Sequence, residues 1–230
     1  MVKKEKKDWR KYWDRIYQAA IDSINHPGGS LKPLPKGESR KYPEIYLFRH
    51  GETYDNRRKI YCGHRDSKLT PKGVQQAHEL RKKLKDKDIN LCIISSLSRS
   101  IDTAKIALRD HLDVKYIVDD RMIERNYGEL QGKSKEKTFR EDTELAVVYR
   151  RGYDVAPPGG ESIKMVEKRV FPFCEELVKR VKENNVNVAI SGHGNSMRVI
   201  RAYFEDMGIV EELTHENPLG RDYAEYVVRW

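Results

Sequence analysis

The segment that decides the fold is residues 45–53, Ile-Tyr-Leu-Phe-Arg-His-Gly-Glu-Thr, in which four apolar residues lead directly into a charged turn with a glycine. Residues 188–194, Val-Ala-Ile-Ser-Gly-His-Gly, repeat this arrangement near the other end of the chain. Short apolar runs rich in β-branched and aromatic residues are typical of buried strands. We therefore predict two strands that each end beside a histidine, His50 and His193.

Several such runs alternate with longer stretches of helical periodicity. The predicted strands are Ile45–Phe48, Leu91–Ser95, Lys115–Val118, Val186–Ser191 and Ala224–Val228. The predicted helices begin at Thr70-Pro71, at Ser98 (to Leu108), at Ser162 (to about Asn184, with a kink at Pro172) and after Asn195. This alternation predicts an α/β fold, a three-layer α/β/α sandwich with a mainly parallel central sheet. Functional residues are then expected at the carboxyl ends of the strands.

The first 43 residues differ from the rest of the chain. Apolar residues at helical spacing (Trp9, Tyr12, Trp13, Ile16, Ala20 and Ile24) predict a helix from Asp8 to Ile24. The run from His26 to Gly29 should end it, and the prolines up to Pro43 predict an extended linker. We therefore divide the chain into a basic helical extension and linker, residues 1–43, and a catalytic domain, residues 44–230.

Composition narrows the class of protein. The net charge is +9, but residues 1–43 carry +6 of it, so the larger domain is close to balanced. The three cysteines share no close spacing, which argues against a zinc or redox pair and against a disulfide scaffold. No signal peptide and no apolar run of membrane-spanning length is visible. We expect a cytoplasmic protein with no membrane partner.

The residues beside the two histidines favour anion chemistry over metal chemistry. Either histidine alone would more often be a hydrogen-bonded structural residue, but two in matching glycine-flanked turns point to function. No His-Glu-x-x-His sequence and no neighbouring cysteine supports zinc, and Arg49 beside His50 disfavours a cation. Arginine offers donors matched to phosphate oxygens, and neutral imidazole can attack phosphorus. We expect a small anionic, phosphorylated substrate and no metal.

The motif Arg49-His50-Gly51-Glu52-Thr53 resembles the signature of the histidine phosphatase superfamily, which includes the cofactor-dependent phosphoglycerate mutases. Three further segments resemble motifs of that family: Thr70–Gly73, Ser95–Ser100 and Ser191–Gly194. The resemblance covers residues 44–230 and implies the mutase-like α/β/α fold. It also implies a phosphohistidine intermediate on His50.

The resemblance is strongest to the mutase branch. Residues 124–132, Glu-Arg-Asn-Tyr-Gly-Glu-Leu-Gln-Gly, with Lys135, the pair Arg150-Arg151 and residues 194–198 are similar to mutase segments. This implies interconversion of 3-phosphoglycerate and 2-phosphoglycerate, primed by 2,3-bisphosphoglycerate and without a metal. Three features depart from the mutases: Asp55, the pair Gly63-His64, and residues 157–162, which resemble broad-specificity phosphatases. Hydrolysis of phosphate esters through the same phosphohistidine stays open as the alternative.

The resemblance also assigns roles to residues. The implied catalytic residues are His50, Glu124, Arg49, Arg99 and His193, and the implied substrate-binding residues are Asn56, Gly63, Tyr127, Lys135, Arg150, Arg151, Gly194 and Asn195. Arg49, Arg99 and His193 would hold the phosphoryl oxygens, with His193 protonated or donating. Asn56 and Gly63 would be further donors. Lys135, Arg150 and Arg151 would form a second cationic cluster for the carboxylate of the substrate.

Glu124 is the acid/base candidate, because the leaving oxygen needs a proton and the incoming hydroxyl must lose one. It would work best if burial raised its pKa, whereas an ion pair with Arg125 or another arginine would lower the pKa.

Other classes of function are less favoured. A pseudo-enzyme that only binds is disfavoured because the nucleophile, the arginines and the acid are all present. The lysines and aromatic residues of the extension could bind nucleic acid, but we prefer a helix packed on the larger domain or on a second subunit. A homo-oligomer stays open, as does the hypothesis that the N-terminal helix covers the catalytic site.

Overall fold

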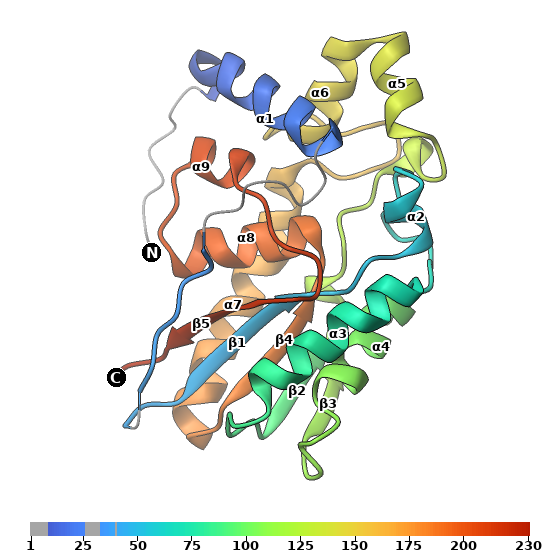
Figure 1. Ribbon diagram of the computed structural model, residues 1–230. Helices are drawn as coiled ribbons and strands as arrows, with labels where there is room; N and C mark the ends of the chain where they lie inside the picture. Colours follow the sequence, from blue (N-terminus) through green and yellow to red (C-terminus); the bar gives the residue numbers. More distant parts are fainter. Residues whose placement is uncertain (1–8, 26–32, 40) are drawn as a thin grey trace.

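The computed structural model describes residues 9–25, 33–39 and 41–230. Its centre is a sheet of β1 (Glu44–Arg49), β2 (Leu91–Ile94), β3 (Lys115–Val118), β4 (Val188–Gly192) and β5 (Tyr223–Val227), in the order β3-β2-β4-β1-β5 (Figure 1). The first four strands run parallel, and β5 pairs antiparallel with β1. The predicted α/β fold with a mainly parallel sheet is confirmed, and the edge strand makes the sheet mixed.

Helices pack on both faces of this sheet. Those of the described chain are α1 (Trp13–Asn25), α2 (Tyr54–Arg57), α3 (Pro71–Leu84), α4 (Ser98–Ala107), α5 (Lys135–Glu141), α6 (Thr143–Arg151), α7 (Ile163–Asn184), α8 (Gly194–Phe204) and α9 (Ile209–Thr214). Short 3-10 turns are η1 (Trp9–Tyr12), η2 (Asp120–Met122) and η3 (Gly128–Leu130). α3 and α4 cover one face, and α7 and α8 cover the other.

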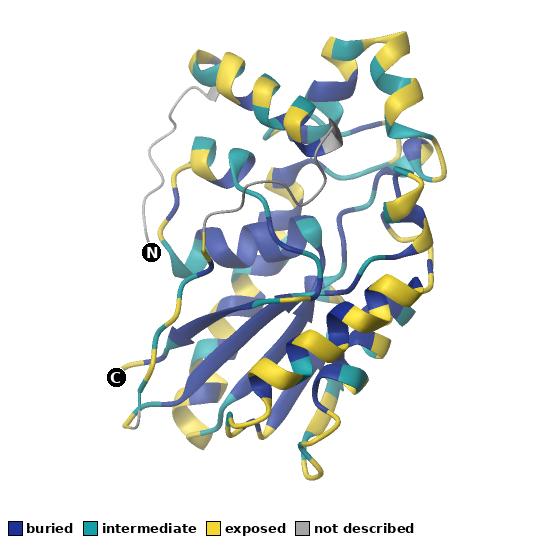
Figure 2. Ribbon diagram, viewed as in Figure 1, coloured by how far each residue is buried: buried dark blue, intermediate teal, exposed yellow. Residues whose placement is uncertain are grey.

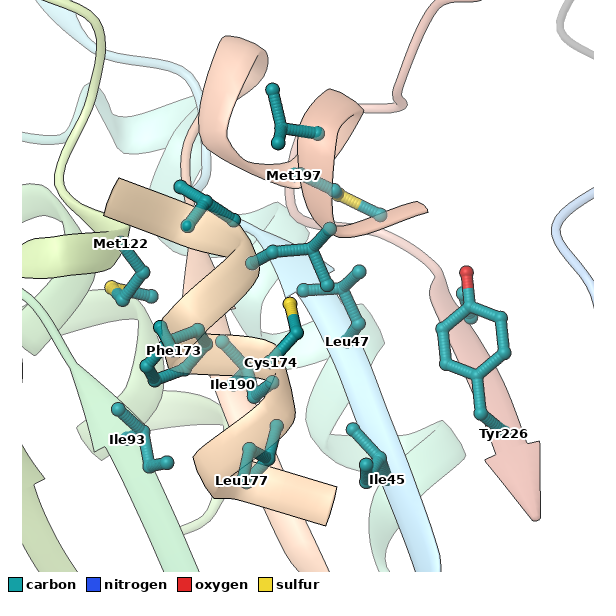
Figure 3. Packing of buried hydrophobic residues seen from close by; sticks show 14 of the residues in the cluster. Ile45, Leu47, Ile93, Met122, Phe173, Cys174, Leu177, Ile190, Met197 and Tyr226 are labelled. Atoms are coloured by element: carbon teal, nitrogen blue, oxygen red, sulfur yellow. The ribbon is translucent and has the colours of Figure 1, made fainter. Parts of the chain in front are cut away.

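Alternation along β1 explains the two hydrophobic layers. Ile45 and Leu47 face the cluster built with α7 and α8, whereas Tyr46 and Phe48 face the cluster built with α3 and α4. Successive side chains of a strand point to opposite faces, so one buried strand feeds both cores. Figure 3 shows the first cluster, with Phe173 of α7 among the strand residues. Figure 2 shows the inner strands β1, β2 and β4 as almost continuously buried, whereas the edge strand β3 is largely exposed.

Several helices were not predicted from the sequence. α5 is short and largely polar, α6 is short, and each begins at a side-chain cap: Ser134 accepts from Lys137 N, and Asp142 accepts from Leu145 N. Only these caps marked them, since helices this short lack a long apolar stripe. The predicted start at Thr70-Pro71 is correct, with the Thr70 hydroxyl accepting from Gly73 N at 3.0 Å. α7 continues through Pro172, and the kink there stays a prediction.

The N-terminal extension packs against the main core. Ile16 and Ala20 of α1 are fully buried, and Ile16 belongs to the same cluster as Ile45 of β1. The predicted helix therefore exists, although it starts as the 3-10 turn η1. Asp8 and the predicted stop at residues 26–29 lie outside the described residues. The division of the chain at residue 43 stays a prediction.

The extended linker lies beside the sheet. Glu225 N of β5 donates to Pro35 O at 2.9 Å, and Gly37 N donates to Glu225 O at 3.1 Å. The outer edge of β5 therefore has backbone partners from the linker. Within the described ranges, no helix is long and apolar enough to cross a membrane.

The packing of α1 predicts a large loss of stability in Ile16→Ala. Removing a fully buried Ile side chain from the core should lower the free energy of unfolding by about 2–5 kcal/mol. Urea unfolding of the full chain measures this, and Arg15→Ala, at an exposed position of the same helix, should change it by less than about 0.5 kcal/mol. Equal, small effects of both substitutions would mean that α1 is not part of the core.

Candidate active site

Two neighbouring parallel strands bring the two histidines together. In the register of β1 and β4, Arg49 lies opposite Gly192, and His50 N donates to Gly192 O at 3.1 Å. The imidazole rings of His50 and His193 have centroids 5.3 Å apart and are tilted by 57°. Both residues are almost fully buried, with His50 2% and His193 0% exposed. The predicted meeting of the two turns at the strand ends is what the structure shows.

His50 has the neutral state and the fixed ring that its predicted role as nucleophile requires. Its Nδ1 lies 2.7 Å from Gly51 O, and because a carbonyl only accepts, Nδ1 must carry the proton. The lone pair of Nε2 is then free. Burial, followed by the positive charge of Arg99, holds the pKa of His50 well below its usual value. The imidazole is therefore uncharged at neutral pH, with its single proton on Nδ1.

His193 is neutral as well. Burial and the charges of Arg99 and Arg49 hold its pKa well below the usual value, so of the two expected states, protonated or donating, only the second fits. Its Nε2 lies 2.8 Å from the hydroxyl of Ser95, the residue after β2. Its Nδ1 is buried and has no partner among the described residues. When the Ser95 hydroxyl donates to Nε2, Nδ1 becomes a donor free for a bound oxygen.

The two arginines beside the histidines are held by carbonyls. Arg99, 1% exposed, donates to Gly63 O at 2.7 Å and to Arg65 O at 2.9 Å. Arg49 donates to Asn217 O at 3.0 Å, and its buried Nε has no partner in the described chain. Carbonyl partners fix the guanidinium groups without neutralising them. Their positive charge therefore remains available to a phosphate group.

Glu124 lies at the same site as a well-bonded carboxylate. Its Oε1 accepts from Arg125 N and Asn195 N, both at 2.9 Å, and its Oε2 accepts from Gly194 N at 3.0 Å. Burial raises the pKa of Glu124, but these hydrogen bonds and the charges of Arg49 and Arg99 outweigh burial and leave the pKa below the ordinary value. Of the two opposite effects considered from the sequence, the lowering by neighbouring arginines, here joined by hydrogen bonds, therefore outweighs the raising by burial in the protein without substrate. Glu124 is ionised there.

The Arg125 guanidinium, which was considered as an ion-pair partner of Glu124, binds backbone carbonyls instead. It donates to Glu161 O at 2.5 Å, to Tyr149 O at 2.8 Å and to Arg150 O at 3.0 Å. The backbone of Glu124 is in turn held from outside, because its carbonyl lies 2.8 Å from His64 Nε2 and accepts from Arg169 Nη2 at 3.2 Å. The loop that carries the carboxylate is thus fixed by side-chain hydrogen bonds with backbone carbonyls.

A second group of cations lies beyond Glu124. Lys135 is partly exposed as a residue, yet burial of its ammonium and the charges of Arg150 and Arg49 lower its pKa to about 7. Arg150 donates from Nε and Nη2 to the Ser23 hydroxyl of α1, at 3.2 and 2.7 Å. Within the described ranges, neither Lys135 nor Arg150 forms an ion pair with a carboxylate, although Glu124 lies within electrostatic reach of Lys135 and Glu216 within reach of Arg150. This group can accept an anion.

Arg151 differs from its neighbour Arg150. It is 3% exposed and forms an ion pair with Glu216, which also pairs with Arg198 at 3.4 Å. These arginines hold the pKa of Glu216 well below its usual range, against the effect of burial. The structure thus gives Arg151 a partner inside the protein, and its contact with a substrate stays a prediction.

The remaining predicted residues occupy different places. The Tyr127 hydroxyl accepts from Asn195 Nδ2 at 3.1 Å, which links both to Glu124. A Cβ on Gly194 would lie 3.2 Å from Arg49 Nη2 and 3.3 Å from Glu124 Oε2, so only glycine leaves these groups undisturbed.

The side-chain oxygen of Asn56 and the backbone oxygen of Gly63 both act as acceptors within the protein. The Asn56 side-chain oxygen accepts from Thr53 N at 3.2 Å, and Gly63 O accepts from Arg99. Their predicted role as donors to a substrate stays a prediction.

Sequence reasoning assigned no role to several residues that build the site. Ser95, which binds His193, was quoted only as part of a motif, and His64 only as a departure from the mutase pattern. Asn217 and Arg169 carry no local signal, because they reach the site from loop and helix positions far along the chain. In the part of the chain that the structure describes, no group of three or more His, Cys, Asp or Glu side chains could hold a metal ion.

The neutral histidines predict that stability falls below the ordinary histidine pKa of about 6.5. There the unfolded chain takes up protons that the folded chain does not, so the free energy of unfolding falls as the pH falls. His50→Gln should reduce this slope by about 1.4 kcal/mol per pH unit between about pH 5 and 6. Urea unfolding at several pH values measures it, with the exposed His78→Gln as control. An unchanged slope in His50→Gln would show that His50 is protonated in the folded protein.

Comparison with known proteins gives a consistent result. Residues 45–220 match the Histidine phosphatase superfamily (branch 1). A 2,3-bisphosphoglycerate-dependent phosphoglycerate mutase of Chlamydia caviae is 33% identical over 77% of this chain and 90% of its own length. Bacillus stearothermophilus YhfR has a TM-score of 0.71 and 27% identity, covering 80% of this chain and 90% of its own.

A mycobacterial glucosyl-3-phosphoglycerate phosphatase, solved with VO3, shares the fold with a TM-score of 0.69 and 23% identity, over 82% of this chain and 98% of its own. The match over most of the chain and the paired histidines at the strand ends lead to one assignment. The chain is a member of the histidine phosphatase superfamily.

Proposed function

We propose that the protein is a phosphoglycerate mutase that interconverts 3-phosphoglycerate and 2-phosphoglycerate through a phosphohistidine on His50. The observation that carries the proposal is the second cation group, Lys135 and Arg150, which lies within electrostatic reach of Arg49 and Glu124 and forms no ion pair with a carboxylate in the described chain. A substrate with a phosphate at one end and a carboxylate at the other would satisfy both groups of cations. The similarity to a mutase over 90% of the relative's length supports the same reading.

Phosphoryl transfer depends on position and charge, and His50 supplies the position. Its Nδ1 is tied to Gly51 O, so the ring cannot turn and Nε2 is the attacking atom. Arg49 and Arg99 stabilise the negative charge on the phosphoryl oxygens in the transition state, and His193 Nδ1 donates one further hydrogen bond to them. Nε2 forms a bond to phosphorus as the ester oxygen leaves with the bonding electrons.

Glu124 handles the proton of the ester oxygen. In its ionised state it accepts the proton of an incoming hydroxyl as the phosphoryl group leaves His50. A bound phosphoryl dianion offsets the charges of Arg49 and Arg99 that keep its pKa low. Glu124 can then hold a proton and deliver it to a leaving oxygen in the opposite direction.

The residues present also fit 2,3-bisphosphoglycerate. Arg49 Nε and His193 Nδ1 are buried donors without a partner in the described chain, and Lys135 lies beyond Glu124. Arg49, Arg99 and His193 would hold one anionic end of this molecule, and Lys135 and Arg150 would hold the other. When bound, it supplies the phosphoryl group that charges His50. We propose Tyr127, Asn195, Asn56, Gly63 and Arg151 as the residues that complete the binding site.

Hydrolysis of phosphate esters is the second candidate. Residues 157–162 lead directly into α7 at Ile163, with Pro158 O accepting from Glu129 N at 2.9 Å. No longer insertion lies between this turn and the helix. This short connection is what the resemblance to the broad-specificity phosphatases predicts. Water would then take the place of the hydroxyl that receives the phosphoryl group.

The acid/base role of Glu124 predicts a leaving-group effect in Glu124→Gln. With 3-phosphoglycerate, whose alkoxide is a poor leaving group, the rate should fall about 10²–10⁴-fold. With p-nitrophenyl phosphate, which needs no proton on its leaving oxygen, the rate of phosphoenzyme formation should fall less than about tenfold. Steady-state and single-turnover kinetics measure both. Equal losses with the two substrates would mean that Glu124 only holds the site together.

The mutase proposal predicts isomerisation that outpaces hydrolysis. A coupled assay of 2-phosphoglycerate formation, with and without 2,3-bisphosphoglycerate and with EDTA present, is run beside hydrolysis of p-nitrophenyl phosphate. Cofactor-stimulated, EDTA-resistant isomerisation, lost in His50→Ala, is the expected result. Hydrolysis without isomerisation would reject the mutase and establish the phosphatase.

A further inference from the structure

We propose that Ser23 of the N-terminal helix α1 is a positioning residue for Arg150, so that α1 completes the carboxylate end of the substrate site. The proposal rests on the function proposed above and adds a residue from outside the segment that matches the family, residues 45–220. The Ser23 hydroxyl lies at the contact between α1 and the guanidinium of Arg150 (Figure 1 shows the two helices side by side).

The hydrogen bonds at Ser23 have a defined direction. The hydroxyl donates its single proton to Ala20 O at 2.8 Å, so that its lone pairs are left for other donors. Arg150 Nη2 and Nε donate to the same oxygen, at 2.7 and 3.2 Å. One oxygen therefore holds one edge of the guanidinium, and the remaining nitrogen, Nη1, is not engaged by Ser23.

Both sides of this contact are fixed. Ser23 is 9% exposed, and α1 is anchored by the fully buried Ile16 and Ala20. On the other side, Arg150 O and Tyr149 O accept from the buried guanidinium of Arg125. The backbone and one edge of the Arg150 side chain are thus held before any ligand binds, which lowers the entropy cost of binding.

The neutral character of Ser23 matters as much as its position. The charge of Arg150 contributes to lowering the pKa of Lys135 and repels Arg49, so these three cations share one region of the protein. A carboxylate at position 23 would neutralise Arg150 and remove its attraction for a substrate carboxylate. A hydroxyl orients the guanidinium and leaves its full charge for the ligand.

The test compares two ligands that differ in the carboxylate. Calorimetric titration of the full chain with 3-phosphoglycerate and with glycerol 3-phosphate separates recognition of the carboxylate from recognition of the phosphate. In the unsubstituted protein 3-phosphoglycerate should bind more tightly. Ser23→Ala should weaken 3-phosphoglycerate about tenfold and change glycerol 3-phosphate less than about twofold. Arg150→Met, which leaves Lys135 in place, gives the loss of discrimination expected when the guanidinium itself is absent.

Two further variants distinguish positioning from a general loosening of the helix. Ser23→Thr keeps the hydroxyl and should restore most of the affinity for 3-phosphoglycerate. Ile16→Val loosens the packing of α1 without touching Arg150 and should change neither affinity. An unchanged affinity in Ser23→Ala, an equal loss for both ligands, an Ile16→Val effect as large as that of Ser23→Ala, or no preference in the unsubstituted protein would each overturn the proposal.

This test is separate from that of the proposed function. Ligand discrimination that depends on Ser23, found together with an absence of isomerisation, would reject the mutase and leave the role of Ser23 standing. Isomerisation without an effect of Ser23→Ala on either ligand would do the reverse.

Discussion

The site depends on positive charge that the protein buries and does not neutralise. Arg49 and Arg99 lie against the carboxyl ends of the parallel strands, and their guanidinium groups donate to the carbonyls of Asn217, Gly63 and Arg65. A buried cation without a carboxylate is costly, so the rest of the structure must hold it in place. Burial together with these charges keeps both histidines neutral, and backbone hydrogen bonds together with the same charges keep Glu124 ionised. Such an arrangement favours an anion with several oxygens, which is what the proposed phosphate ligand offers.

Carbonyl groups are the means by which this charge is tolerated. Arg125 and Arg169 repeat the arrangement around the Glu124 loop, where their donors bind backbone oxygens of Tyr149, Ile123 and Glu124. Each of these bonds satisfies a donor and fixes a loop. Arg125 binds only backbone oxygens, whereas Arg169 is also ion-paired with Glu161 at 2.8 Å. The region around Glu216 resembles that of Arg169, since Arg151 and Arg198 are paired there with a carboxylate. The structure thus separates cations that brace the fold from cations that remain open to a ligand.

Much of the fold could be predicted because β1 and β4 are apolar and end in recognisable turns. Their lengths and order gave the parallel sheet and the meeting of His50 with His193. The antiparallel direction of β5 could not be predicted, since the sequence of a five-residue strand does not show which way it runs relative to its neighbour. The helices α5 and α6 were missed because their stability comes from caps and tertiary contacts rather than from a long apolar face.

The candidate site was also predicted only in part. Residues within motifs were found, but their protonation states were not, because the pKa of Glu124 depends on hydrogen bonds from Gly194 and Asn195 that only the fold brings near. The contact between Ser23 and Arg150 joins residues 127 positions apart, with no local pattern at either end. The sequence therefore predicted the type of chemistry, but not which residues position the candidate catalytic and binding side chains.

The central claim is that His50 attacks phosphorus through Nε2, because Nδ1 is committed to Gly51 O. The most direct measurement is phosphorus and nitrogen NMR of the phosphoenzyme, trapped at alkaline pH after mixing with a phosphorylated substrate, with the phosphorylated residue located by mass spectrometry. The account predicts one phosphoryl group, on Nε2 of His50. A phosphoryl group on Nδ1 of His50, or on any other residue, would contradict it.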